Sequence, residues 1–137
     1  MEAHKALSDQ EFERQFRDGE FPPAQFSHEA HLRLAWIHIR KYGLGQAREN
    51  VEQQLQRFVA AAGASDKYHA TLTRAAVHAV GHFVKRSDET TFEKFLLDCP
   101  QLKNNFRGLI NSHYSFDIFQ SDKAKAEYVQ PDVSPFI

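Results

Sequence analysis

Three histidines occupy positions at which the sequence otherwise places apolar side chains. His28 and His31 lie in the segment FSHEAHLRLAW, and His69 lies in KYHATLTRAA. An imidazole that is buried without a hydrogen-bond partner costs about 1–3 kcal/mol, so such residues need an explanation. Neutral imidazole binds divalent metal ions and accepts protons. The pattern therefore indicates a pocket for a small molecule or for a divalent metal ion such as Zn²⁺ or Ni²⁺.

The candidate metal ligands are His28, His31 and His69, and the candidate ligand-binding residues are the same three together with Thr73 and Tyr114. Residues three positions apart on a helix have Cβ atoms about 5–6 Å apart, so His28 and His31 can reach one ligand. The H-x-x-H spacing is looser than the HExxH motif of zinc enzymes, and local spacing fixes no third ligand. If the pocket is catalytic, a histidine base or a metal-bound water would perform hydrolysis or proton transfer.

The same residues also have a purely structural interpretation. Buried histidines are commonly bonded to a carbonyl or a hydroxyl group, and threonine often bonds to a carbonyl of its own helix. Under this alternative, the chain is a noncatalytic structural or protein-interaction domain with a polar core. The sequence leaves both interpretations open, and with them the question of whether the protein is an enzyme.

Two predicted helices position the histidines. One is expected at residues 28–42, with Ser27 as the N-cap and Gly43 as the C-terminal stop, and the other at about residues 67–85. All three histidines fall close to a predicted helix N-terminus. The helix dipole and burial both favour neutral imidazole there.

A helical wheel places His28 and His31 beside the apolar stripe of the first helix, and His69 on the apolar stripe of the second. We therefore expect the two helices to face each other and the three rings to converge near their N-terminal ends. The wheel turns Glu29 away from this stripe, and we interpret it as a first-turn charge that the helix dipole stabilises. His4 belongs to no motif and is a weaker candidate.

Apolar residues recur at helical spacing along the rest of the chain, which predicts an all-α, single-domain bundle of about six helices spanning residues 1–137. The other expected helices lie at about residues 9–19, 45–62, 92–99 and 100–110, with a single turn at 115–119 and a short helix at 122–128. The tail at 129–137 contains two prolines, so we expect it to be extended.

The composition and charge of the chain limit the kinds of molecule that we expect it to bind. The net charge is −1 and the 17 basic residues are scattered, so we expect no nucleic-acid partner. The start of the chain, MEAHKALSDQEF, lacks the apolar stretch of a signal peptide, and no segment approaches the ~18 apolar residues of a membrane span. Cys99 is the only cysteine, which suits a reducing cytoplasm. These features predict a cytoplasmic protein without a membrane partner.

The motifs resemble those of an uncharacterised bacterial family of small all-helical proteins. The matching motifs are F-x-H-x-x-H-L-x-x-A-W at residues 26–36, Y-H-x-T-L-T at 68–73, Y-S at 114–115, and a C-terminal pattern at Ser121, Ala124, Lys125, Tyr128, Val129, Pro131 and Asp132. The resemblance implies a helical fold and a candidate site, but no activity. The polar positions that match are His28, His31, His69, Thr71, Thr73, Tyr114 and Ser115.

Two residues of the C-terminal pattern weaken the implication that this pattern binds a ligand. Lys125 stands where the family has arginine, and lysine cannot reproduce the forked contact of a guanidinium with an anion. Asp132 has a structural alternative to a binding role, because its carboxylate can cap or tether the tail.

Overall fold

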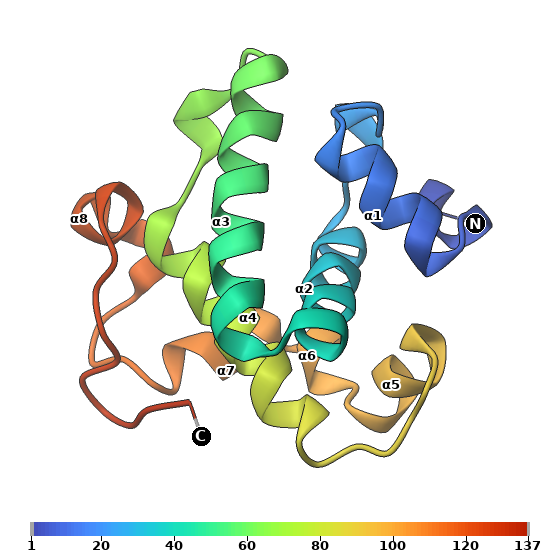
Figure 1. Ribbon diagram of the computed structural model, residues 1–137. Coiled ribbons are helices and arrows are strands. Elements are labelled where there is room, and N and C mark those ends of the chain that lie inside the picture. Colours follow the sequence, from blue (N-terminus) through green and yellow to red (C-terminus); the bar gives the residue numbers. More distant parts are fainter. Residues whose placement is uncertain (1, 137) are drawn as a thin grey trace.

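The computed structural model describes residues 2–136, which contain helices and loops but no strand (Figure 1). The all-α prediction is confirmed. This part of the chain has eight α-helices, five of them seven residues or longer, where about six were predicted. The helices are α1 (Asp9–Arg17), α2 (His28–Tyr42), α3 (Leu44–Ala61), α4 (Ala70–Val84), α5 (Phe92–Asp98), α6 (Gln101–Asn104), α7 (Phe106–Asn111) and α8 (Asp122–Ala126).

Four short 3₁₀ helices connect these elements: η1 (Ala3–Ala6), η2 (Pro23–Gln25), η3 (Ser65–Lys67) and η4 (Ile118–Gln120). None of the helices in residues 2–136 combines the length and the apolar character needed to cross a lipid bilayer. The segment that follows α8 is non-helical as far as residue 136, as predicted for the tail.

Capping residues account for the start of α1 and for both ends of α2. The Ser8 hydroxyl accepts a hydrogen bond from the Glu11 N–H, and the Ser27 hydroxyl accepts one from the Ala30 N–H, both at 3.1 Å. Gly43 ends α2 with φ +84° and ψ 163°, a conformation that is essentially open only to glycine. This residue lets α3 begin immediately after α2.

Three local predictions were wrong. The helix expected from residue 67 begins at Ala70, because His69 is its N-cap and has an extended backbone, with φ −123° and ψ 108°. The single helix expected at 100–110 is divided into α6 and α7, because Asn105 leaves the helical region, with φ −144° and ψ 44°. Asparagine competes with helix formation by offering its own side chain to the backbone. The turn expected at 115–119 is the 3₁₀ helix η4, three residues later.

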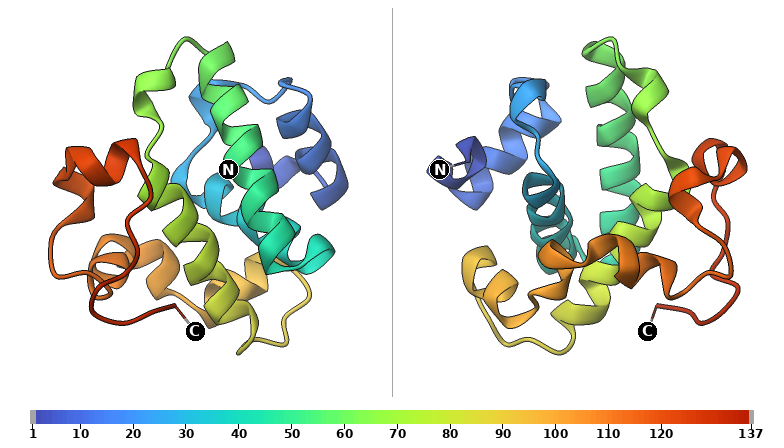
Figure 2. Two further views of the ribbon diagram at one scale, coloured as in Figure 1. Left: turned by 60° about the vertical axis from the view of Figure 1, so that its left-hand side comes forward. Right: turned by 180° about the vertical axis from the view of Figure 1, so that it is seen from behind.

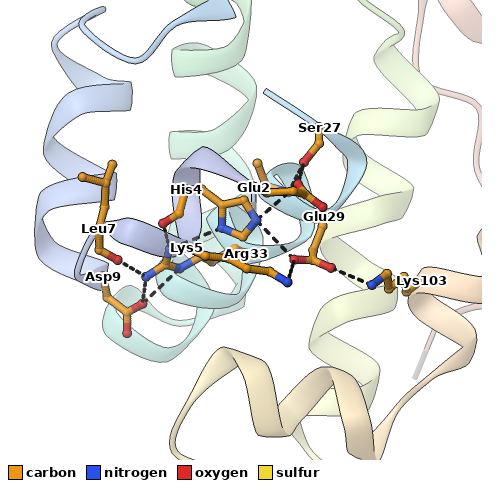
Figure 3. Close-up of polar contacts among 10 residues, drawn as sticks. Glu2, His4, Lys5, Leu7, Asp9, Ser27, Glu29, Arg33 and Lys103 are labelled. Atoms are coloured by element: carbon orange, nitrogen blue, oxygen red, sulfur yellow. Dashed lines mark hydrogen bonds and ion pairs between the residues drawn. The ribbon is translucent and has the colours of Figure 1, made fainter. Parts of the chain in front are cut away.

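Helix α2 is the central helix. It packs against α1, α3, α4 and α6, and the α1 and α8 ends of the chain lie on opposite sides of it (Figure 2). Residues 29–39 are buried with the exception of His31, which is partly exposed. Glu29 and Arg33 are therefore buried, although the wheel turned Glu29 away from the apolar stripe. The reason is that residues 2–8, here called the N-terminal segment, lie against that face of α2, as Figure 3 shows.

The core is one cluster with many phenylalanine side chains. Phe16 stacks against Phe58 with 4.5 Å between the ring centroids, which joins α1 to α3. Trp36 of α2 packs against Phe92 of α5 at 5.8 Å. Cys99 is buried in the same cluster. These contacts hold α1, α3 and α5 around α2.

Candidate functional site

His69 serves as the N-cap of α4. Its Nδ1 accepts a hydrogen bond from the Leu72 N–H at 3.0 Å, and its Nε2 lies 2.9 Å from the Ile118 carbonyl oxygen. A ring that accepts at Nδ1 must carry its proton on Nε2, and it donates that proton to the carbonyl. Both nitrogens are thus bonded within the chain, and a metal ion could bind at neither without breaking one of these bonds.

His28 and His31 point to different surroundings. His28 is exposed on the first turn of α2, with Nε2 3.0 Å from the Leu102 carbonyl and its ring 4.6 Å from the Phe106 ring. His31 lies beside Phe26, with 5.8 Å between the centroids. Its Nε2 is fully enclosed and has no hydrogen-bond partner. Burial, and to a smaller extent the neighbouring His28, lowers the pKa of His31 to about 4, so the ring is neutral at pH 7.

The structure does not bring the three predicted metal ligands together. Their neighbours are the Leu102 carbonyl for His28, the Phe26 ring for His31, and the Ile118 carbonyl for His69. Within residues 2–136, the group of three potential ligand atoms that lie within 4.8 Å of one another is formed by Glu2, His4 and Glu29.

Thr73 and Tyr114, the two predicted ligand-binding hydroxyls, are bonded within the chain. Thr73 Oγ1 donates to the His69 carbonyl at 2.7 Å. Tyr114 donates its hydroxyl proton to the Val129 carbonyl at 2.8 Å. Burial raises the pKa of Tyr114, so it remains a donor across the physiological range. These contacts agree with the structural interpretation of both residues.

Other motif residues hold residues 127–136, here called the C-terminal segment. Thr71 Oγ1 donates to the Glu127 carbonyl and accepts from the Val129 N–H, both at 2.9 Å. The Asp132 carboxylate accepts from the Ser115 N–H at 2.8 Å and from the Ser115 hydroxyl. Asp132 therefore tethers the tail, which was the structural alternative for this residue.

A cleft of about 830 Å³ lies between the N-terminal segment, α2 and the α5–α6 region. We call it the charged cleft. Its lining includes the charged side chains of Glu29, Arg33 and Lys103, and the apolar side chains of Leu96 and Leu97 on α5. Leu97 is 77% exposed, so this apolar side is open to solvent. The volume falls within the range of about 300–1,000 Å³ that is typical of small-molecule sites.

Arg33 fixes the N-terminal segment against this cleft (Figure 3). Its NH1 donates to the His4 carbonyl, and its NH2 donates to the Leu7 carbonyl at 2.8 Å. Nε and NH2 also bond to Asp9 Oδ1, at 3.2 and 2.8 Å. The guanidinium is thus fully engaged within the protein, and it orders the backbone that carries His4.

Glu29 is the anionic centre of the cleft, and it is only 4% exposed. Lys103 lies 3.0 Å from Oε1, and Lys5 lies 3.3 Å from Oε2. Burial alone would raise the pKa of Glu29, but the bonds and charges of the two lysines outweigh it, and the pKa is lowered. Burial, assisted by Arg33, lowers the pKa of His4. The cleft therefore combines an ionised carboxylate with a neutral imidazole at pH 7.

Sequence reasoning missed His4, Glu29, Arg33 and Lys103. Glu29 is a first-turn charge of α2, as expected, but it is buried, because the N-terminal segment covers it and two lysines pair with it. One signal was present. Glu29 and Arg33 are four residues apart in an otherwise largely apolar helix, HEAHLRLAWI, which leaves little room for a solvated face.

Comparison of the chain with models of protein families, with curated proteins and with solved structures found no match. The fold and the site therefore define the class of protein by themselves. It is an all-α domain in which a charged cleft lies between the N-terminal segment, α2 and the α5–α6 region.

Proposed function

We propose that this protein binds a small organic anion with an apolar body in the charged cleft. The observation that carries the proposal is that one cleft of about 830 Å³ is lined both by the exposed lysines Lys5 and Lys103 and by the α5 leucines, of which Leu97 is exposed and Leu96 half-buried. A site that is largely preformed, with an apolar lining and a few convergent polar groups, is the usual form of a small-molecule site. The proposal keeps ligand binding as the function and moves the site away from the predicted histidines.

We infer that the ligand has an anionic group because the two lysines of the cleft have N–H donors that remain free. Lys5 and Lys103 each have three N–H donors, and each is paired with Glu29 through one contact. Their side chains are 45% and 53% exposed, so the remaining donors can bond to a carboxylate or a phosphate in the cleft. Arg33, by contrast, is engaged with the protein and serves to hold the site.

We infer that the ligand has an apolar part because α5 contributes apolar side chains to the cleft. Leu96 and Leu97 line the cleft beside Phe92, and Leu97 is one of the few large apolar side chains in residues 2–136 that are exposed. Each buried methylene group contributes about 0.8 kcal/mol to binding, so an alkyl chain laid along these residues adds affinity. The two sides together favour an amphipathic anion.

The test adds hexanoate, hexyl phosphate or hexanol to the whole chain. NMR chemical shifts of the backbone amides then report where each probe binds. We expect shifts around residues 4–5, 29–33 and 92–104 with both anions and much weaker shifts with hexanol. Lys103→Gln should weaken hexanoate binding several-fold, whereas the matched control Lys67→Gln should not. Leu97→Asn should also weaken binding, with Val133→Asn as its control, since Val133 is exposed elsewhere.

Two results would contradict the proposal. Shifts centred on His69, Thr73 and Tyr114, without shifts at residues 4–5 and 92–104, would return the site to the predicted pocket. Equal responses to hexanoate and hexanol would remove the anionic requirement. If no probe binds, the structural alternative gains support, because His69, Thr71 and Tyr114 already have all their polar groups bonded within the chain.

A further inference from the structure

Three side chains bring one potential metal ligand each to the edge of the charged cleft (Figure 3). His4 Nε2 lies 3.4 Å from Glu2 Oε1 and 3.3 Å from Glu29 Oε2. Ligands that bind one Zn²⁺ ion at the usual lengths and at a tetrahedral angle stand about 3.4 Å apart. The observed separations match that spacing, and they exceed the usual ~2.7–3.2 Å of an N–H···O hydrogen bond.

A second observation concerns the imidazole itself. His4 is 1% exposed, and its Nε2 is enclosed without a hydrogen-bond partner. Polar atoms buried in proteins nearly always have a hydrogen bond of normal length, whereas His4 Nε2 has two carboxylate oxygens at 3.3 and 3.4 Å, an arrangement that a cation between the three atoms would complete. Each of the two nearest carboxylate oxygens is acceptor-only when ionised, and a cation satisfies all three atoms at once.

We propose that Glu2, His4 and Glu29 bind a divalent transition-metal ion of the Zn²⁺ type. One imidazole and two carboxylates form a mixed nitrogen and oxygen set, which suits Zn²⁺ better than Mg²⁺ or Ca²⁺, since these ions prefer oxygen ligands alone. Three protein ligands leave the fourth tetrahedral position free for water or another ligand. The inference does not depend on the organic anion proposed above, because the ion can be titrated without it.

Neighbouring groups hold two of the ligands in place. The Ser27 hydroxyl donates to Glu2 Oε1, which fixes that carboxylate at the start of α2. Lys103 pairs with Glu29 Oε1 and leaves Oε2 directed at His4. Such supporting contacts orient metal ligands and commonly change affinity by about 10–100-fold when they are removed.

Two neighbours must adjust when the ion binds. Lys5, 3.3 Å from Glu29 Oε2, must withdraw to solvent, which its 45% exposure permits. Arg33 NH1 lies 3.3 Å from His4 Nδ1, and a guanidinium can only donate, so the ring proton is on Nε2. When the Nε2 lone pair binds the ion, that proton moves to Nδ1. NH1 then keeps its bond to the His4 carbonyl.

The experiment titrates the whole, untagged chain with Zn²⁺ in competition with a chromophoric chelator, after prior removal of metal. We expect one equivalent to bind. Glu2→Gln should weaken binding at least tenfold and should fold normally, because the Glu2 side chain is 38% exposed. Lys5→Gln should strengthen binding several-fold, because it removes the competing ammonium. A set of adventitious surface ligands would not respond to Lys5 in this direction.

Matched controls locate the ion. Glu49→Gln changes an exposed carboxylate of α3, and His82→Gln removes one member of the His78–His82 pair on α4. Both should bind Zn²⁺ as the unmodified chain does. Absence of binding, unchanged affinity of Glu2→Gln, or loss of binding in His82→Gln would each overturn the inference. Zn²⁺ binding without a response to hexanoate would keep the metal site and reject the proposed function, and the reverse result would do the opposite.

Discussion

His69 uses its imidazole for a task that serine, threonine, aspartate and asparagine usually perform. Its Nδ1 accepts from the Leu72 N–H, while its Nε2 reaches across to the Ile118 carbonyl in η4. One ring thus caps α4 and attaches a segment from near the other end of the chain. A histidine near a helix N-terminus can therefore match a binding motif for structural reasons alone.

The capping role of His69 predicts a graded loss of stability. His69→Ala should lower the free energy of unfolding by about 1–2 kcal/mol, because it removes the cap. His69→Asn should recover part of that loss, because asparagine is a good N-cap but is too short to reach Ile118. Urea denaturation of the three proteins measures the difference. Equal stabilities would contradict the cap and would restore His69 as a candidate ligand-binding residue.

His31 predicts a second effect at the residue scale. The folded pKa of about 4 lies below the ordinary value of about 6.5, so the unfolded chain binds the extra proton between these values. The stability that neutral His31 contributes is complete above pH 6.5 and is lost as the pH falls toward 4. NMR titration of the ring should give a pKa near 4. His31→Leu should lose less stability than the unmodified chain between pH 7 and pH 5, and parallel losses would contradict this account.

At the scale of elements, two terminal segments cover faces that isolated helices would expose. The N-terminal segment covers the Glu29 and Arg33 side of α2, held by the guanidinium of Arg33. The C-terminal segment is held by Thr71 of α4 and by Tyr114 and Ser115 after α7. In the structure, Thr71, Tyr114 and Ser115 therefore attach the non-helical C-terminal segment to the helices.

Thr71→Val tests how the C-terminal segment is attached. Valine has the same shape but leaves the Glu127 carbonyl and the Val129 N–H without their partner. Buried unpaired groups cost about 1–3 kcal/mol each, so we expect a loss of roughly 2 kcal/mol and faster amide exchange over residues 127–134. Thr73→Val is the matched control, since the Thr73 hydroxyl donates to the carbonyl of its own helix cap, His69, and this variant should lose less. Similar exchange in both variants would contradict the attachment.

At the scale of the whole molecule, burial keeps the imidazole of several histidines neutral. Burial is the main cause that lowers the pKa of five enclosed or half-buried histidines: His4, His31, His38, His78 and His82. Two buried carboxylates behave in the opposite sense. Lysine contacts lower the pKa of Glu29, and contacts with Tyr42 and Lys41 lower that of Glu13, in each case against the effect of burial.

These shifts predict a two-stage acid response. The histidine contribution to stability is complete above about pH 6.5 and falls below it, because unfolding then takes up protons. The carboxylate contribution persists above about pH 4.5 and is lost at lower pH, as Glu13 and Glu29 are protonated. Urea unfolding at half-unit steps from pH 8 to pH 3 should therefore show stability falling from about pH 6.5 downward and again below 4.5. A stability maximum near pH 5 would contradict the prediction.

The predictable part of the fold is the part that local chemistry specifies. Ser8, Ser27 and Gly43 determined the ends of the first two helices, because caps and positive φ angles act over a few residues. The break at Asn105 and the late start of α4 were not predicted. The late start of α4 depends on the His69 side chain, which bonds to the backbone as an N-cap, and the break depends on the non-helical backbone of Asn105; periodicity reveals neither.

The candidate site lay beyond prediction for a different reason. A helical wheel gives the direction of each side chain, but not what covers it. His28, His31 and His69 were correctly placed near two helix starts, yet the hydrogen-bond partners of His28 and His69 come from residues far along the chain. The same holds for His4, which meets Glu29 only because the N-terminal segment folds back over α2.

The sequence by itself therefore determined an all-α chain, the first two helices and the residues able to cap them, since these depend on short-range chemistry. Only the tertiary structure decided that the predicted histidines have separate partners, and that Glu2, His4 and Glu29 share one site beside a charged cleft. The physical reason is that burial and pairing are properties of packed surfaces. The wheel turns Glu29 away from the apolar stripe, but it does not show that His4 and Lys5 of the N-terminal segment and Lys103 of α6 lie against its carboxylate.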